Sequence, residues 1–168
     1  MPSDYRKPAN ADLSAILESL IKAEIKFILV GGLAAVIQGA PLTTLDVDIV
    51  HERSAENITR LFNFLKSVDA IYRRPDDKII SPGKDDFSGL VHALFPTRAG
   101  PLDILAVIEE GKTYEDLIDH TIEINFRDHA LHVLNLETLI SLKKASRNPK
   151  HQQQLLILEE TLRQLKKR

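Results

Sequence analysis

Two aspartates separated by one residue, Asp46 and Asp48, have a type and spacing that indicate chemistry. They fall in the short run 46–50, which predicts a β-strand, and residues two apart on a strand point to the same face. The two carboxylates would then lie side by side, with Cα atoms about 6.6 Å apart. Like charges at that distance repel unless a cation lies between them. Because Mg²⁺ and Mn²⁺ prefer oxygen ligands, the pair predicts a divalent-metal site.

A pair of glycines, Gly31 and Gly32, precedes Asp46 with thirteen residues between them. They follow an apolar run at 27–30 that predicts a strand, and they precede a short predicted helix at 33–38. Glycine lets a backbone approach phosphate closely, and a helix N-terminus offers it free N–H groups. Each feature alone is more often a tight turn or an exposed strand edge. Together, a phosphate cradle and a carboxylate pair on adjacent strands favour a metal–triphosphate site, the chemistry of phosphoryl or nucleotidyl transfer.

The combined pattern resembles the nucleotidyltransferase superfamily related to DNA polymerase β. It is most similar to the small bacterial members found among minimal nucleotidyltransferases and AbiEii-type toxins. Their signature is an apolar residue, Gly, then Gly or Ser, a spacer, and Asp-apolar-Asp/Glu-apolar, which this chain matches at residues 30–32 and 46–49. The resemblance covers residues 12–165. It implies Mg²⁺ or Mn²⁺ as cofactor, an NTP as substrate, and Gly31 and Gly32 as nucleotide-binding residues.

The resemblance also implies a third carboxylate on a later strand. Asp103 is the best match because apolar residues flank it and a turn precedes it. Asp46, Asp48 and Asp103 would then be both the catalytic residues and the metal ligands. The competing interpretation is that Asp103 merely caps or pairs at a strand start. Asp85 and Asp86, in a predicted loop, are weaker candidates.

The family further places a lysine on a C-terminal helix, where it reaches the nucleotide phosphates. The family pattern Leu-Glu-x-Leu-Ile-x-x-Lys matches residues 136–143, which favours Lys143, with Lys144 second, as nucleotide-binding residues. The alternative is a solvent-facing pair at a helix C-terminus, where the helix dipole favours lysine.

The chain departs from the family pattern at two places. Relatives often have a basic residue before the aspartate pair, where this chain has Pro-Leu-Thr-Thr at 41–44, and many have Asp where His151 stands.

Composition excludes several other classes of protein. The chain has 168 residues, which suits one domain, and it has no cysteine. It therefore cannot form a disulfide scaffold, a thiolate zinc site or an iron–sulfur site. It contains no P-loop motif, no Gly-x-Ser-x-Gly, and no histidine pair with zinc-hydrolase spacing. The first residues lack the apolar core of a signal peptide, and the longest apolar runs fall short of the ~20 residues that span a bilayer. We expect a cytoplasmic protein without a membrane partner.

The order of elements predicts an α/β (α+β) fold with a single domain, a mixed sheet flanked by helices and a helical C-terminal end. We expect residues 1–10 to form a flexible arm, residues 11–134 the core, and residues 135–168 the helices packed on it. The predicted strands lie at 27–30, 46–50, 89–95, 102–108, 122–126 and 130–134.

Charge is distributed unevenly along the chain. From residue 142 to the end there are eight Lys and Arg against two Glu, whereas the whole chain has a net charge of −2. A basic C-terminal end either serves a phosphate site or solvates a helix face.

The expected function is metal-dependent transfer of an NMP from an NTP to an acceptor hydroxyl, with Asp103 orienting the nucleophile. The acceptor would be RNA such as tRNA, a protein or a small molecule, and a toxin or antitoxin could be the cognate partner. The alternative is a catalytically inactive binding partner with the same fold.

Overall fold

The computed structural model describes residues 12–68, 93–97 and 99–168. Its α-helices and strands follow the chain as α1 (Leu13–Lys22), β1 (Phe27–Val30), α2 (Gly31–Ile37), β2 (Val47–His51), α3 (Ala55–Ser67), β3 (Ala93–Thr97), β4 (Gly100–Leu105), α4 (Tyr114–Leu117), β5 (Thr121–Phe126), β6 (His129–Leu134), α5 (Leu136–Ala145) and α6 (Pro149–Lys166). Two 3₁₀ turns, η2 (Glu109–Gly111) and η3 (Ile118–His120), flank α4. The order of strands and helices confirms the predicted α/β fold class.

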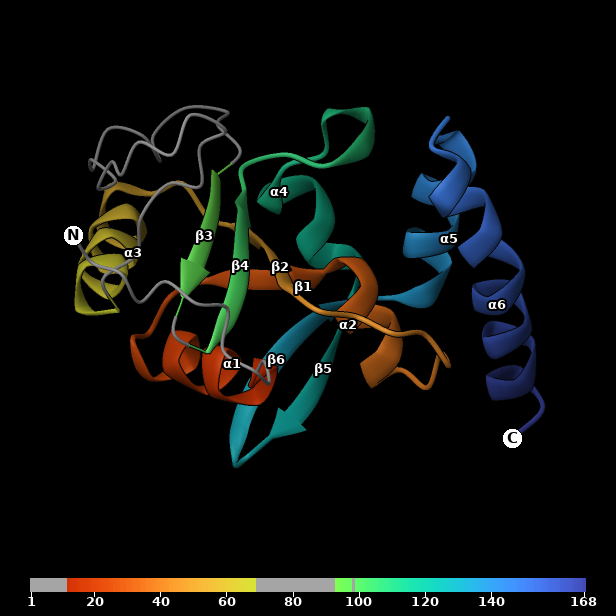
Figure 1. Ribbon diagram of the computed structural model, residues 1–168, viewed down its shortest axis with the longest axis horizontal. Coiled ribbons are helices and arrows are strands. Elements are labelled where there is room, and N and C mark those ends of the chain that lie inside the picture. The colour runs from red at the N-terminus through yellow and green to blue at the C-terminus, as the bar shows by residue number, and fades with distance from the viewer. Residues whose placement is uncertain (1–11, 69–92, 98) are drawn as a thin grey trace.

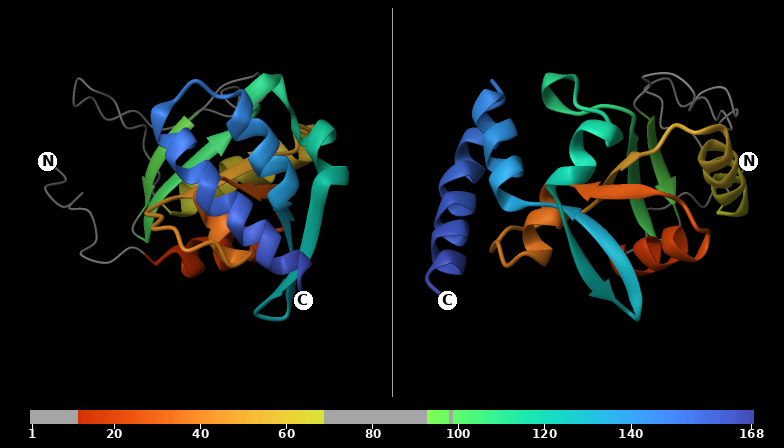
Figure 2. Two further views of the ribbon diagram at one scale, coloured as in Figure 1. Left: turned by 90° about the vertical axis from the view of Figure 1, so that its right-hand side faces the viewer. Right: turned by 180° about the vertical axis from the view of Figure 1, so that it is seen from behind.

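Within these residues six strands form one mixed sheet in the order β3-β4-β2-β1-β6-β5. The β2–β4 and β1–β6 pairs are parallel, and the other neighbours are antiparallel. Helices α5 and α6 pack side by side at one end of the sheet, and α1 and α3 lie toward the other end (Figures 1 and 2). The parallel pairing of β2 with β4 matters most for function, because it aligns two strands that are distant in sequence.

The core explains why the central strands form where they do. Strand β1 consists of Phe-Ile-Leu-Val, and all four residues are buried. A strand without polar alternation is typical of one that is covered on both faces. Helix α1 packs Ile16, Leu17 and Leu20 into this core, and Asp12 caps its first turn by accepting a hydrogen bond from the Ala15 N–H at 3.0 Å. The apolar residues of α1 recur at helical spacing, so they lie on one face of the helix.

Several predicted boundaries differ from the structure. The strand predicted at 102–108 is β4, which runs from Gly100 to Leu105. Strand β2 begins at Val47, so Asp46 precedes the strand that was predicted to contain it. Helix α2 begins at Gly31, so the glycines form its first turn and do not precede it. The strand predicted at 89–95 lies largely outside the described residues, and β3 is described from Ala93. None of the described helices combines the length and apolar character needed to cross a membrane.

The buried side chain of Asn57 joins the ends of the two central strands. Its Oδ1 accepts a hydrogen bond from the Lys26 N–H at 2.7 Å, and its Nδ2 donates to the carbonyls of Lys26 (2.9 Å) and Glu52 (2.8 Å). Lys26 precedes β1 and Glu52 follows β2, so one amide fixes where both strands meet α3.

We expect Asn57→Ala to lower the free energy of unfolding by about 2–4 kcal/mol, because it leaves three backbone groups without this partner. Chemical denaturation measures the change. Asn63→Ala, at an exposed position on the same helix, is the matched control and should change stability by less than about 0.5 kcal/mol. Equal stability of the two variants would show that the three hydrogen bonds contribute little.

Candidate active site

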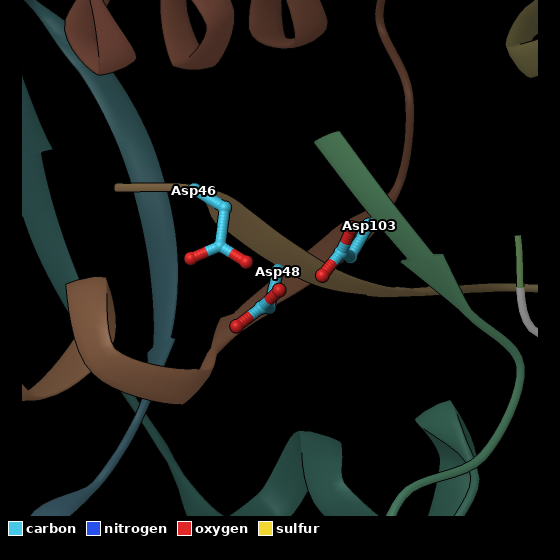
Figure 3. A group of neighbouring side chains, drawn as sticks. All are labelled: Asp46, Asp48 and Asp103. Carbon is cyan, nitrogen blue, oxygen red and sulfur yellow. The ribbon is translucent and has the colours of Figure 1, made fainter. Parts of the chain in front are cut away.

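Three aspartates converge at β2 and β4, two neighbouring interior strands of the sheet that run in parallel. Asp48 on β2 and Asp103 on β4 are register partners, and Asp46 lies two residues before Asp48. One carboxylate oxygen of each residue lies within 4.8 Å of the others, and all three side chains are partly buried (Figure 3). Asp103, the third carboxylate that the resemblance implies, lies on a strand beside Asp48 and close to both other carboxylates. The weaker candidates Asp85 and Asp86 lie outside the described residues.

The backbone at Gly31 lies directly against the carboxylate of Asp48. A Cβ added at Gly31 would lie 2.2 Å from Asp48 Oδ2, and Gly31 has a φ of +71°, which side chains rarely tolerate. A Cβ at Gly32 would lie 3.2 Å from Thr44 Oγ1, a tight but less severe approach. The first glycine is therefore required by two independent constraints, its backbone conformation and the position of Asp48. The first turn of α2 therefore leaves the room that the Asp48 carboxylate occupies.

We expect Gly31→Ala to displace the Asp48 carboxylate and to abolish measurable Mn²⁺ binding. The left-handed backbone should also cost about 1–2 kcal/mol of stability. Gly39→Ala is the matched control, because Gly39 has a φ of +104° but nothing within 4 Å of its added Cβ. Both variants should be destabilised, and only Gly31→Ala should lose the metal. Calorimetric titration with Mn²⁺ measures the difference, and wild-type affinity in Gly31→Ala would contradict it.

Asp46 and Asp48 open onto a cavity of about 530 Å³ that has two chemically different walls. One wall carries Asp46, Asp48 and the glycine turn of α2. The opposite wall comes from the α5–α6 region and consists of Lys143, Asn148, Lys150, His151 and Gln154. A space bounded by carboxylates on one side and cationic and amide groups on the other suits a metal ion together with phosphate.

Lys143 lies in the wall of this cavity and is only 8% exposed. Its Nζ donates a hydrogen bond to Gln154 Oε1 at 2.9 Å. Burial lowers the pKa of the Lys143 ammonium, and the charges of Glu109 and Asp48 partly oppose that change. The Lys143 ammonium lies close enough to Asp48 to be influenced by its charge. An anion bound to a metal ion at Asp48 would therefore also meet this ammonium.

The structure separates the two lysines that the sequence placed together. Lys144 has a side chain that is 60% exposed and forms an ion pair with Glu159 at 3.2 Å. It does not line the cavity beside the aspartates, because adjacent residues on a helix point about 100° apart. The structure therefore brings Lys143, and not Lys144, to the site.

Several residues of the cavity wall had no signal in the sequence. Asn148, Lys150 and Gln154 reach the cavity because α6 turns back against α5, and neither glutamine nor asparagine belongs to the motif. His151, which the sequence marked as a departure from the family, does line the cavity. Its Nδ1 lies 2.8 Å from Ser146 Oγ and 3.9 Å from Glu109 Oε1. Burial lowers the pKa of His151, and the nearby charge of Lys143 acts in the same direction.

Comparisons with known proteins agree with this geometry at the level of fold. No protein-family model matches the chain, and no curated protein matches it. Among solved structures, the chain is similar to the lincosamide antibiotic adenylyltransferase LnuA in its lincomycin-bound crystal structure, with 13% identity and a TM-score of 0.61, covering 90% of this chain and 99% of that one. It is also similar to the antibiotic-resistance factor ANT(2'')-Ia, with 13% identity and a TM-score of 0.52, covering 88% and 80% of the two chains. The chain has the nucleotidyltransferase fold, as the motif resemblance implied.

Proposed function

We propose that this chain is a metal-dependent nucleotidyltransferase that transfers an NMP from an NTP to an acceptor hydroxyl. The observation that carries the proposal is the convergence of Asp46, Asp48 and Asp103 beside a cavity whose opposite wall bears Lys143 and Lys150. Carboxylates and lysines that face each other across one space provide ligands for a cation and contacts for phosphates in the same site. The likeness to an adenylyltransferase supports this assignment.

The three aspartates fit a divalent cation by their chemistry and their spacing. Oxygen ligands suit Mg²⁺ and Mn²⁺, and three carboxylate oxygens within 4.8 Å of one another can contact one ion or two adjacent ions. The missing Cβ at Gly31 leaves the space that the Asp48 carboxylate occupies. When bound, such an ion supplies charge neutralisation for the triphosphate and lowers the pKa of an acceptor hydroxyl.

The remaining steps fall to residues of the chain itself. The backbone at Gly31 and Gly32 would seat the phosphates, and the Lys143 ammonium would contact the triphosphate from the opposite wall. Asp103 would orient the acceptor hydroxyl toward the α-phosphorus. A bond from the acceptor oxygen to that phosphorus forms as the bond to pyrophosphate breaks, and Asp103 or water takes the hydroxyl proton.

The acceptor is the least constrained part of the proposal. The likeness to a lincomycin-bound adenylyltransferase supports a small-molecule hydroxyl as a candidate acceptor, alongside RNA and protein. The eight Lys and Arg after residue 141 favour a polyanionic acceptor such as tRNA. A cognate toxin or antitoxin is the candidate protein partner.

A catalytically inactive binding partner is the second candidate. It is favoured by the lack of a basic residue at 41–44 and by His151 at a position where many relatives have Asp. Both features concern contacts to substrate, whereas all three carboxylates that would hold the metal are present. An inactive protein would keep nucleotide binding without transfer.

Transfer of label from each of the four α-³²P-labelled NTPs tests the two candidates. The wild-type protein is incubated with Mg²⁺ or Mn²⁺ and with total RNA, lysate protein or a panel of small molecules that includes lincomycin. We expect label on one acceptor class, with no transfer by Asp48→Asn. Binding of an NTP without any transfer would favour the inactive partner, and a folded protein that neither binds nor transfers would overturn both.

A further inference from the structure

A hydrogen bond between α5 and α6 holds the Lys143 ammonium in the cavity wall. The Nζ of Lys143 donates to Oε1 of Gln154 at 2.9 Å, and both side chains line the cavity that contains Asp46 and Asp48. Lysines that are almost fully buried are usually paired with a carboxylate. Here the hydrogen-bond acceptor is a neutral amide.

The neutral character of this acceptor has a consequence for charge. An ammonium has three N–H donors, and Gln154 accepts one of them, so the positive charge and further donors stay available to an anion. A carboxylate in the same place would hold the ammonium as firmly and would also neutralise it. Because Lys143 already lies in the field of Asp48 and Glu109, its position decides whether it acts on phosphate or on these carboxylates.

We propose that Gln154 is a positioning residue that fixes the Lys143 ammonium at the cavity wall while leaving its charge for the triphosphate. This inference rests on the proposed function, because it concerns the phosphate contacts of the same site. A purely structural alternative exists, in which the hydrogen bond merely joins α5 to α6. The two roles predict different effects when the amide becomes a carboxylate.

Two variants of Gln154 separate positioning from structure. Gln154→Glu keeps an acceptor of the same size but adds a negative charge, and Gln154→Met removes the acceptor at nearly the same volume. The probe is inorganic tripolyphosphate with Mg²⁺, which carries the phosphate chain without requiring that the preferred base be known. Calorimetry measures its Kd, and thermal unfolding measures Tm.

We expect Gln154→Glu to keep or raise Tm, because it forms an ion pair with Lys143, and yet to bind tripolyphosphate about tenfold more weakly. Gln154→Met should weaken binding about three- to tenfold. The matched controls are Gln153→Glu and Gln153→Met, at the exposed neighbouring position, and they should stay within about twofold of wild type. In a Lys143→Ala background, Gln154→Met should cause no further loss, since it acts through the lysine.

Three results would count against the proposal. Wild-type affinity in Gln154→Glu would leave only the structural role. A full effect of Gln154→Met in the Lys143→Ala background would show that Gln154 does not act through the lysine. If the folded wild-type protein fails to bind tripolyphosphate with Mg²⁺, the proposed function itself fails, and that outcome differs from the other two because it appears before any substitution is made.

Discussion

Asp46→Asn and Asp48→Asn are each expected to reduce NMP transfer on the order of a hundredfold or more. Asparagine preserves the shape of the side chain but replaces one anionic oxygen with an N–H donor that a cation cannot use. The loss of charge beside a metal–triphosphate complex falls directly on the reacting centre. Steady-state transfer of labelled NTP measures the effect. Asp119→Asn, at an exposed position outside the site, is the control and should retain wild-type activity.

Asp46→Asn should also change stability in the opposite direction from activity. Its carboxylate oxygen lies within 4.8 Å of oxygens of Asp48 and Asp103, so the neutral side chain removes repulsion in metal-free buffer. The expected gain in the free energy of unfolding is on the order of 1 kcal/mol. Addition of Mg²⁺ should stabilise the wild type and leave the variant unchanged, because a ligand stabilises only the form that binds it.

Denaturation with and without Mg²⁺ therefore gives a measurement that does not depend on the acceptor. A variant that is less active, more stable without metal and insensitive to metal identifies the aspartates as a cation site. Stabilisation by Mg²⁺ to the same extent in wild type and in Asp46→Asn would remove the metal interpretation.

Lys143→Ala is expected to weaken NTP binding roughly ten- to a hundredfold, because a charge-assisted contact to phosphate contributes on the order of 1.5–3 kcal/mol. Lys143→Met retains the buried stem without the charge and should lose the same affinity, which separates the contact from packing. Lys144→Ala should have little effect, since Lys144 pairs with Glu159 outside the cavity. Fluorescence titration with a labelled NTP measures these affinities.

The lysines at the C-terminal end of α6 provide the remote control. Lys166 lies sixteen residues beyond Lys150 on the same helix, which corresponds to about 24 Å along its axis. Screening weakens charges beyond about 8 Å at physiological salt, so Lys166→Ala and Lys167→Ala should change NTP affinity by less than about twofold. If these two substitutions impair transfer to RNA but not NTP binding, the basic end is a docking surface for the acceptor. If Lys143→Ala behaves like them in every measurement, the charge asymmetry only solvates the helix.

The sequence was informative wherever the pattern of apolar and polar residues within a short segment determines its secondary structure and the direction of its side chains. The fully apolar run at 27–30 predicted a strand, and the structure has one there in which all four residues are buried. The alternation of Asp46 and Asp48 with apolar residues placed both carboxylates on one face even though β2 begins only at Val47. The one-residue error at the strand end did not matter for the site, because the Asp46 carboxylate still lies beside those of Asp48 and Asp103.

Local pattern could not settle which of two adjacent helical residues faces the site. Lys143 and Lys144 have the same chemistry, and both lie in the last turn of α5, so each fits a dipole interaction as well as a phosphate contact. Only the packing of α5 against α6 buries one and exposes the other. The same packing brings Gln154 and Lys150 to the cavity, although nothing in their own surroundings along the chain indicates it.

By itself, then, the sequence determined the α/β class, the strand–helix–strand around the glycine pair, and the two neighbouring carboxylates, since each depends on periodicity within a few residues. The tertiary structure decided the rest. The register that sets Asp48 opposite Asp103 comes from parallel strands that are distant in sequence, and the close approach of Gly31 to Asp48 comes from the antiparallel register that sets Val30 opposite Asp48. Register and helix rotation depend on how whole faces pack together, and that information is spread across the chain rather than held in any one segment.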